Sequence, residues 1–204
     1  ITSSVLISAL FSNAIAQQIA NGNFENWTIN TLYEEPDSFL STNSWLYMST
    51  GNGNVAKTSS AYHGTYAVQL TTMQTSTDTM FGGLFIGTPG NQMVNGGIPY
   101  TGQPDSVSVY VKYNIQPNDT AFFIVAFKNG GTIISMAVQT FTGTQTTYKR
   151  ISVPTNLPVS PVPDSLVAII SSSNLDPPRF PGSTLTLDSV TMIGTTQQFP
   201  NPSF

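Results

Sequence analysis

The chain has 204 residues, six of them basic and ten acidic, with a formal net charge of −4 and only 8% charged residues. Six scattered basic residues cannot neutralise a run of phosphates, which argues against nucleic acid as a partner. Cysteine is absent, which excludes a disulfide framework, a thiolate nucleophile and a sulfur-ligated metal site.

The first twenty residues have the pattern of a secretion signal. Residues 5–11 (VLISALF) are apolar, and Ala14-Ile15-Ala16 before Gln17 matches a small-residue cleavage site. A short core helix is the alternative interpretation. The pattern predicts a signal-peptide remnant in residues 1–20 and a protein that is secreted or held at the cell surface. Since no later stretch approaches the ~20 apolar residues of a membrane span, we expect no transmembrane segment.

Residues 21–195 read as one all-β domain, and no segment in them shows helical periodicity. Residues 107–113 alternate between apolar and polar side chains, which is typical of a half-buried strand. The apolar runs 121–127 and 132–138 are joined by Asn129-Gly130-Gly131, which predicts a hairpin. Further apolar rows lie at residues 66–70, 84–86, 151–153, 166–170 and 185–187. The pattern predicts an antiparallel two-sheet β-sandwich, a jelly roll.

Long connections between these strands are the expected places for binding. Residues 28–43, 88–103 and 174–182 carry proline, glycine and several aromatic side chains, and long loops on a rigid scaffold often hold ligands. Residues 196–204 are proline-rich and cannot form a central strand. They are expected to be a linker.

Aromatic side chains in or beside these loops are the candidate ligand-binding residues. Sugar rings present apolar C–H faces that stack on aromatic planes, while their hydroxyls need polar partners. If residues 45–47 form a strand, Trp45 and Tyr47 share a face. For each aromatic residue, a place in the core is an equally valid interpretation. The loop aromatics are Trp27, Tyr33, Trp45, Tyr47, Tyr62 and Tyr100; the ligand-binding candidates are the last five of these together with Arg179.

Two carboxylates near the ends of the domain are candidates for a structural cation. Strand parity points Glu25 and Asp188 outward, and they come together if the first and last strands are neighbours. Calcium binds six to eight oxygen atoms, from carboxylates and carbonyls alike. Asn23 and Gly64 are the additional candidate ligands. Two unrelated surface acids are the alternative.

Catalysis has little support in the sequence. The only histidine, His63, precedes Gly64 in an apparent turn and has no serine or cysteine motif around it. A glycoside hydrolase needs two carboxylates flanking one bond, and the clustered acids Glu34, Glu35 and Asp37 read as solvated loop residues. We therefore expect a protein that is not an enzyme, with a small hydrolase as the less favoured alternative.

Three segments resemble jelly-roll carbohydrate-binding modules: residues 21–27 (NGNFENW), 62–70 (YHGTYAVQL) and 187–190 (LDSV). The spacing of the segments between them resembles the carbohydrate metabolism domain of secreted Bacteroidetes proteins, and the resemblance covers residues 21–193. It implies a sandwich, sugar recognition and a calcium ion on Glu25 and Asp188. No catalytic residue carries over from it.

Residues 199–203 (FPNPS) resemble the start of the C-terminal sorting domain of type IX secretion. This implies export and a chain that continues beyond Phe204. The resulting hypothesis is a secreted, non-catalytic carbohydrate-binding module that recognises glycan through loop aromatics. The alternative is a surface structural or adhesion module without a sugar pocket.

Overall fold

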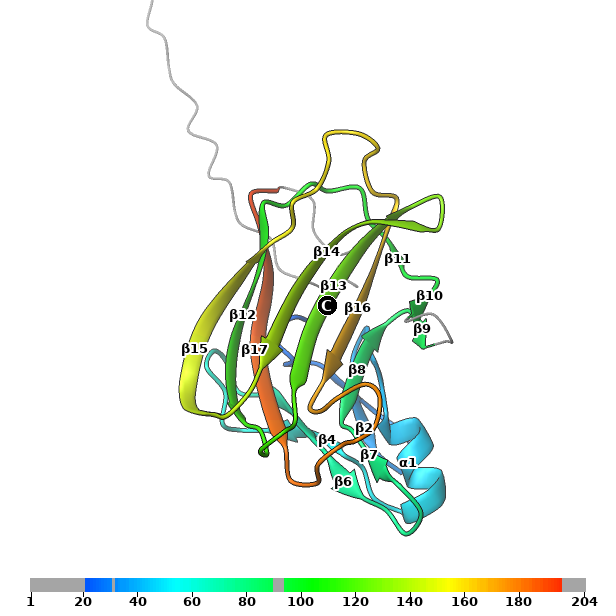
Figure 1. The fold of residues 1–204 in the computed structure, drawn as a ribbon, viewed down its shortest axis with the longest axis vertical. Coiled ribbons are helices and arrows are strands. Elements are labelled where there is room, and N and C mark those ends of the chain that lie inside the picture. The colour runs from blue at the N-terminus through cyan, green and yellow to red at the C-terminus, as the bar shows by residue number, and fades with distance from the viewer. Residues whose placement is uncertain (1–20, 31, 90–93, 196–204) are drawn as a thin grey trace, which may run out of the picture.

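The computed structural model describes residues 21–30, 32–89 and 94–195, which fold into two antiparallel sheets packed face to face (Figure 1). The predicted signal remnant at 1–20 and the predicted linker at 196–204 lie outside the described residues. Sheet 1 has the strand order β15 (Thr144–Pro154), β12 (Ser106–Asn114), β17 (Thr184–Ile193), β5 (Ala67–Thr71) and β4 (Val55–Thr58).

Sheet 2 faces it, with the order β14 (Thr132–Phe141), β13 (Ala121–Asn129), β16 (Ser165–Ser171), β8 (Gly83–Ile86) and β3 (Leu40–Ser41); β11 (Ile98–Pro99) also pairs with β16. Three two-stranded pairs lie outside these sheets: β1 (Trp27–Ile29) with β2 (Glu34–Pro36), β6 (Met73–Gln74) with β7 (Thr79–Met80), and β9 (Thr88–Pro89) with β10 (Val94–Asn95). The predicted all-β, antiparallel sandwich is confirmed.

The strands form where the apolar pattern places them. All eight predicted apolar rows coincide with strands of the two sheets, although Tyr66 lies just before β5. The predicted hairpin is also present, because Gly130 and Gly131 separate β13 from β14 at φ of 56° and 81°. Two consecutive positive φ values suit the right-handed twist of the flanking strands, and glycine adopts them without strain.

The main core fills the space between the sheets with one face of every long strand. Val107, Val109 and Val111 of β12 point inward, as do Phe123 and Phe127 of β13, and all five are fully buried. Phe24, from the opening segment, is also fully buried there. Burial of these side chains on both inner faces holds the two sheets together.

Sheet 2 carries a second apolar layer on its outer face. Strand register places Ile124, Ile169 and Phe85 side by side across β13, β16 and β8. With Ala126 and Val167 they form a separate buried cluster, against which Phe81, Phe122 and Leu175 pack. The central strands of sheet 2 are therefore buried on both faces.

The one helix among the described residues, α1 (Asn43–Thr50), lies in a segment where the sequence shows no helical periodicity. Only Asn43 and Leu46 are buried in it, so its sequence lacks the apolar stripe that reveals most helices. It ends at Gly51, which has φ of 70° and donates its N–H to Tyr47 O, a common helix termination. No helix in the described ranges is long and apolar enough to cross a membrane.

Candidate functional site

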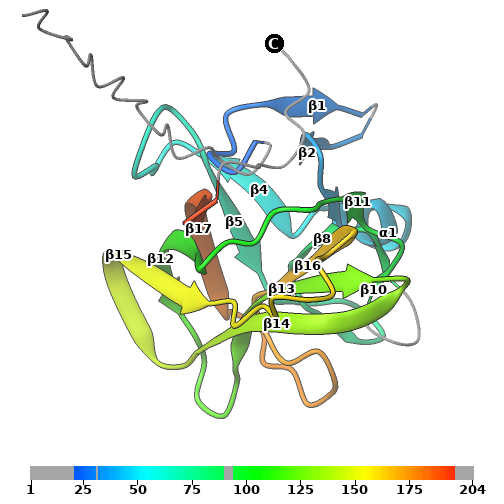
Figure 2. The ribbon, with the colours of Figure 1, turned by 90° about the horizontal axis from the view of Figure 1, so that it is seen from above.

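A pocket of about 390 Å³ lies where the β1–β2 hairpin and α1 approach β4 at the edge of sheet 1. Figure 2 shows the hairpin beside β4, far from β15 at the other edge of the sheet. Three aromatic rings line the pocket, one from β1, one from the hairpin loop and one from α1. The lining residues are Trp27, Leu32, Tyr33, Glu34, Asn43, Tyr47, Gly53, Val55, Ala56 and Lys57.

Two of these rings lie against each other. Tyr33 and Tyr47 are stacked, with ring centroids 5.1 Å apart and planes inclined by 26°. The indole of Trp27 is held by a 2.6 Å hydrogen bond from Nε1 to Phe24 O. Fixed aromatic planes beside polar groups form the kind of surface on which a sugar ring can stack.

A paired charge supplies the polar side of the pocket. Lys57 Nζ lies 2.9 Å from Glu34 Oε2 and 3.0 Å from Glu34 Oε1. The same ammonium lies over the rings of Trp27, at 5.7 Å, and Tyr66, at 4.9 Å. Because the two charges neutralise each other, the pocket carries hydrogen-bonding groups without a net charge.

Asn43 holds the wall of the pocket in place. Its Oδ1 accepts hydrogen bonds from Asn54 N at 2.8 Å and Val55 N at 3.0 Å, and its Nδ2 donates to Val55 O at 2.8 Å. The buried amide therefore ties the start of α1 to β4. With these bonds made, it orients the pocket and leaves ligand contacts to its neighbours.

Tyr33 is also perturbed electrostatically. Partial burial, and secondarily the charge of Glu35, raise the pKa of the Tyr33 phenol above its ordinary value. The hydroxyl stays protonated at neutral pH and can donate a hydrogen bond to a ligand oxygen.

The structure brings Tyr33 and Tyr47 together but separates Trp45 from them. The expectation that Trp45 and Tyr47 share a face rested on strand parity, and it is wrong because both residues lie in α1. Side chains two positions apart on a helix point to nearly opposite sides. Trp45 instead packs on Phe85 with ring centroids 5.9 Å apart, at the outer face of sheet 2.

Tyr100 and Arg179 do not reach the pocket either. Tyr100 has 0% exposure and packs against Phe127 in the core, so its ring is not accessible to a ligand. Arg179 donates to Asn174 O, Leu175 O and Thr79 O, and its guanidinium lies over Phe81 at 5.1 Å. The Arg179 guanidinium stabilises its own loop through these bonds and does not present a free N–H donor to a ligand.

Tyr62 belongs to a different cluster, on the outer face of sheet 1. It stacks on Tyr110 with ring centroids 3.7 Å apart and planes inclined by 15°. His63 and Tyr148 approach its ring edge-on, at 4.4 Å and 5.8 Å. The ligand candidates chosen from the sequence therefore fall at several separate places.

The candidate cation residues surround one loop, residues 62–66. Asp188 Oδ2 accepts hydrogen bonds from Tyr62 N at 2.6 Å and His63 N at 2.9 Å. Glu25 Oε1 accepts from Thr65 N at 2.7 Å and Tyr66 N at 2.8 Å. The opening segment also joins the last strand through Val190 N and Gly22 O, 2.8 Å apart.

The other two candidate cation ligands, Gly64 and Asn23, are less well placed to bind an ion. Gly64 lies so near Glu25 that a Cβ on it would come 2.2 Å from Glu25 Oε1, while Asn23 makes no side-chain hydrogen bond to another described residue. No group of three His, Cys, Asp or Glu side chains gathers in the part of the chain that the structure describes. A cation here depends on these two carboxylates with amide and backbone carbonyl oxygens, a donor set made only of oxygen, which is what calcium prefers.

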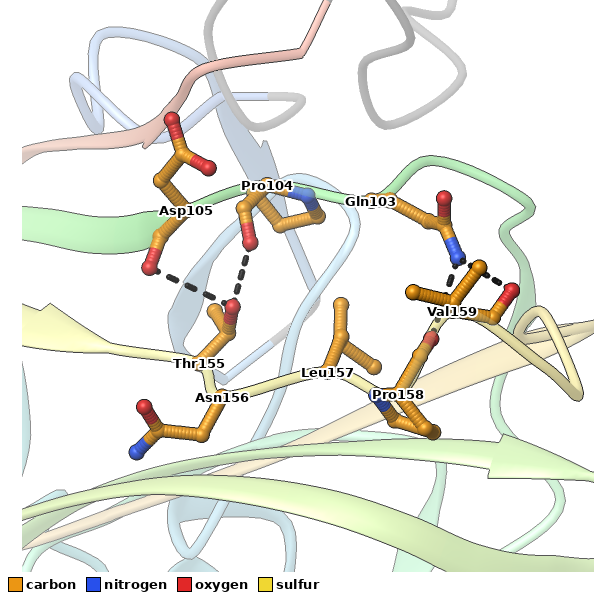
Figure 3. A pocket seen from close by; sticks show the side chains of 8 residues that line it. All are labelled: Gln103, Pro104, Asp105, Thr155, Asn156, Leu157, Pro158 and Val159. Atoms are coloured by element: carbon orange, nitrogen blue, oxygen red, sulfur yellow. Dashed lines mark hydrogen bonds between the residues drawn. The ribbon is translucent and has the colours of Figure 1, made fainter.

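Two further pockets occupy the ends of the sandwich. One, of about 360 Å³, lies between residues 103–105 and 155–159 (Figure 3). There the Gln103 amide turns toward Pro158 O and Val159 O, and Thr155 Oγ1 donates to Pro104 O. The other, of about 470 Å³, is lined by residues 114–120 and 142–144. Neither has an aromatic ring in its lining, and in each of the three pockets a single carboxylate lines the wall: Glu34, Asp105 or Asp119.

Comparison with known proteins identifies the architecture. No family model and no curated protein matches the sequence. Among solved structures, a "putative glycoside hydrolase" from Bacteroides thetaiotaomicron aligns at a TM-score of 0.64 and 17% identity, over 87% of this chain and 71% of that one. The chain has the jelly-roll fold. At this identity the likeness extends to the fold alone.

Two carbohydrate-binding modules also align, with lower scores. A family 16 module has a TM-score of 0.48 and 17% identity, over 87% of this chain and 99% of its own. A promiscuous module of the β-sandwich superfamily has a TM-score of 0.46 and 15% identity, over 86% and 63%.

The sequence did not single out the polar half of the pocket. Glu34 read as a solvated loop acid, and Lys57 lies on a short edge strand with no motif around it. Trp27 is one of several loop aromatics in the sequence, with no motif that marks it as a ligand-binding residue. The available signal is the presence of five aromatic residues within residues 27–47, three of which line the pocket, but a single sequence does not show which of them converge.

Proposed function

We propose that this protein is a non-catalytic carbohydrate-binding module that binds glycan in the pocket formed by Trp27, Tyr33 and Tyr47. The observation that carries the proposal is the convergence of three aromatic rings beside the Glu34–Lys57 pair. The rings offer planes for the C–H faces of a sugar, and the ion pair offers an acceptor and donors for its hydroxyls. A volume of about 390 Å³ suits a short stretch of a glycan chain.

We propose binding in preference to hydrolysis because of the carboxylates. Glycosidases generally place two carboxyl groups on either side of the scissile bond. In this pocket Glu34 is the only carboxylate in the lining, and it pairs with Lys57. Its neighbour Glu35 points elsewhere, accepting hydrogen bonds from Ser41 N at 3.2 Å and Ser41 Oγ at 2.7 Å.

Substitution of Tyr47 tests the proposal. Binding of the purified protein to a panel of neutral polysaccharides is measured by affinity electrophoresis, and positive interactions are quantified by calorimetry. Removing one stacked ring should weaken binding about tenfold, as for other aromatic contacts buried by a ligand. Met48→Ala is the matched control, because Met48 is the next residue of α1 and is 84% exposed outside the pocket.

Two results would count against a sugar pocket. Equal loss in Tyr47→Ala and Met48→Ala would show that the helix, and not the ring, matters. Failure of the native protein to bind any glycan in the panel would favour the alternative, a structural or adhesion module at the cell surface.

We also propose a structural calcium ion held by Glu25 and Asp188, with Asn23 and Gly64 beside it. Support comes from the shared loop that both carboxylates bind and from the resemblance of residues 21–27 and 187–190 to calcium-holding modules. A cation bound only by the folded protein must raise its melting temperature. Melting in calcium and in chelator tests this, with Glu25→Gln as the variant in which any shift should disappear; identical melting in both conditions would remove the ion from the proposal.

Export to the cell surface is the last part of the proposed function. It rests on the signal-like pattern of residues 5–17 and on the resemblance of residues 199–203 to a type IX sorting domain, all outside the described residues. Sequencing the N-terminus of the native protein recovered from the culture medium or the cell surface tests it. Cleavage near Gln17 is expected, whereas an intact leader on cytoplasmic protein would contradict it.

A further inference from the structure

The outer face of sheet 1 carries two outward-facing cations on adjacent strands. Register pairs Tyr110 of β12 with Arg150 of β15, so their side chains lie on the same face. Lys112 reaches that face too, where its ammonium contacts Ser60 and lies 4.8 Å from the centre of the Tyr148 ring. This face lies across the sheet from the aromatic pocket, since β17 and β5 separate β12 from β4.

Between the two cations lies the tyrosine cluster. Tyr62 covers Tyr110 and is itself 44% exposed. Tyr148 is anchored by a 2.7 Å hydrogen bond from its hydroxyl to Ser60 O. The loop that carries Tyr62 is held in turn by Asp188, so the cluster is rigid and open to solvent on one side.

The positive charge of this face has no acidic counterpart. All sixteen charged residues of the chain lie in the described ranges, and Lys57 is the only basic residue among them in an ion pair. Neither β12 nor β15 contains an acidic residue. The nearest acid in register is Asp188, which lies opposite Tyr110. Asp188 has 0% exposure, and its carboxylate already accepts hydrogen bonds from the backbone N–H groups of Tyr62 and His63.

Arg150 retains most of its binding capacity. Its Nε donates to Ser108 Oγ at 2.8 Å, and its two Nη groups have no hydrogen bond to the rest of the described chain. A guanidinium presented this way matches the two oxygens of a carboxylate or the oxygens of a sulfate. An exposed guanidinium of this kind, outside any ion pair, is open to an anionic group of a ligand.

We propose that this face binds an acidic polysaccharide, with its carboxylate or sulfate groups at Arg150 and Lys112 and sugar rings against Tyr62. Register places Arg150 opposite Tyr110, two residues from Lys112 on β12, and Tyr62 stacks on Tyr110. A ligand that contacts both cations therefore meets the tyrosine cluster as well. Beyond Arg150 the face continues with hydroxyls, where Ser152 Oγ donates to Ser106 Oγ at 2.9 Å. This site goes beyond the proposed neutral pocket, in both its position and its charge.

The experiment compares polymers of defined charge on the purified native protein. Polygalacturonate, dextran sulfate and neutral dextran are tested by affinity electrophoresis and calorimetry at low salt. We expect binding to at least one acidic polymer that weakens as salt is added, and an affinity about tenfold lower in Arg150→Gln, corresponding to one charge-assisted contact. Lys112→Gln should act in the same direction.

Lys149→Gln is the matched control. Lys149 precedes Arg150 on the same strand, but register pairs it with the inward-facing Val111, so it points away from this face. Removing it changes the net charge by the same amount. Equal loss of affinity in Lys149→Gln and Arg150→Gln would mean general attraction between charges and would overturn the site.

Two other outcomes also overturn the proposal: failure of both acidic polymers to bind, and tighter binding to DNA or to phosphatidylserine vesicles than to either polymer. The result is independent of the neutral pocket. Tyr47→Ala should leave binding of the acidic polymer unchanged even if it abolishes binding of neutral glycan.

Discussion

Gly53 lies directly against the ring of Tyr47: a Cβ on Gly53 would come 2.8 Å from Tyr47 Cε2 and 2.6 Å from Asn43 Oδ1. Gly53→Ala should therefore push the Tyr47 ring and loosen the Asn43 bonds to β4. We expect a loss of roughly 1–3 kcal/mol in the free energy of unfolding, as for other overpacked sites, together with weaker binding of neutral glycan. Urea denaturation and calorimetry measure the two effects.

The exposed neighbour Asn52 provides the comparison for this variant, and Asn52→Ala should change stability and binding little. Gly53→Ala with native stability and native glycan affinity would show that the wall of the pocket is more yielding than these contacts indicate.

The variant Trp45→Ala tests whether the side of α1 that carries Trp45 contributes to glycan binding. Because Trp45 packs on Phe85 at the outer face of sheet 2, its loss should leave binding in the Tyr33–Tyr47 pocket unchanged. Its 46% exposure limits the expected loss of stability to about 1–2 kcal/mol, less than a fully buried tryptophan. Calorimetry with the glycan that binds the native protein checks this. A marked loss of affinity would indicate that the glycan binds beside Trp45, at the outer face of sheet 2.

Asp119 holds three segments together at one end of the sandwich. Its carboxylate accepts hydrogen bonds from Ser173 Oγ at 2.6 Å, Ser183 Oγ at 2.5 Å and Asn174 N at 3.1 Å, and the residue is 3% exposed. Asp119→Ala leaves these donors buried without an acceptor, so we expect a loss of about 2–4 kcal/mol by urea denaturation. Asp176→Ala, at an exposed loop position, should change stability little, and similar losses in both variants would contradict a special role for Asp119.

Stability should fall at alkaline pH because of Tyr100. Burial, partly offset by a hydrogen bond with Thr195, raises the pKa of Tyr100 from 10.0 to about 12. The folded state thus holds the phenol proton more tightly than the unfolded state. This contribution is complete below pH 10 and is lost as the pH rises toward 12, by about 2–3 kcal/mol.

Tyr100→Phe removes this proton and isolates its effect from that of the titrating lysines. The difference in unfolding free energy between the native protein and the variant should shrink between pH 10 and 12. A difference that stays constant over that range would mean that Tyr100 does not control alkaline stability.

The long strands were predictable because their signal is local. Alternation in residues 107–113, and continuous apolar runs in 121–127 and 166–170, are set by which face each side chain presents to the core. Helix α1 gave no such signal, since it buries little more than Leu46 and begins at an asparagine whose function is to bind β4. The short strands β1 to β3 likewise depend on partners that are distant in the sequence.

The candidate site was predictable only in part. Chemistry pointed to Tyr33 and Tyr47 as sugar-stacking residues, but the same argument selected Tyr100, which fills the core. Tertiary packing decides whether an aromatic ring is exposed. The prediction for Trp45 assumed a strand, and it fails because the segment is helical. The ion pair of Glu34 with Lys57 joins residues 23 positions apart, and no local sequence pattern predicts it.

The two-sided burial of sheet 2 has a consequence for how the molecule opens. Backbone amides of β13 and β16 are shielded above and below, by Phe123 and Phe127 on one face and by Ile124 and Ile169 on the other. Their hydrogens exchange with solvent only when the whole domain unfolds, whereas the β1–β2 hairpin can detach in a local fluctuation. The aromatic pocket, which this hairpin helps to line, can therefore open locally while β13 and β16 stay closed.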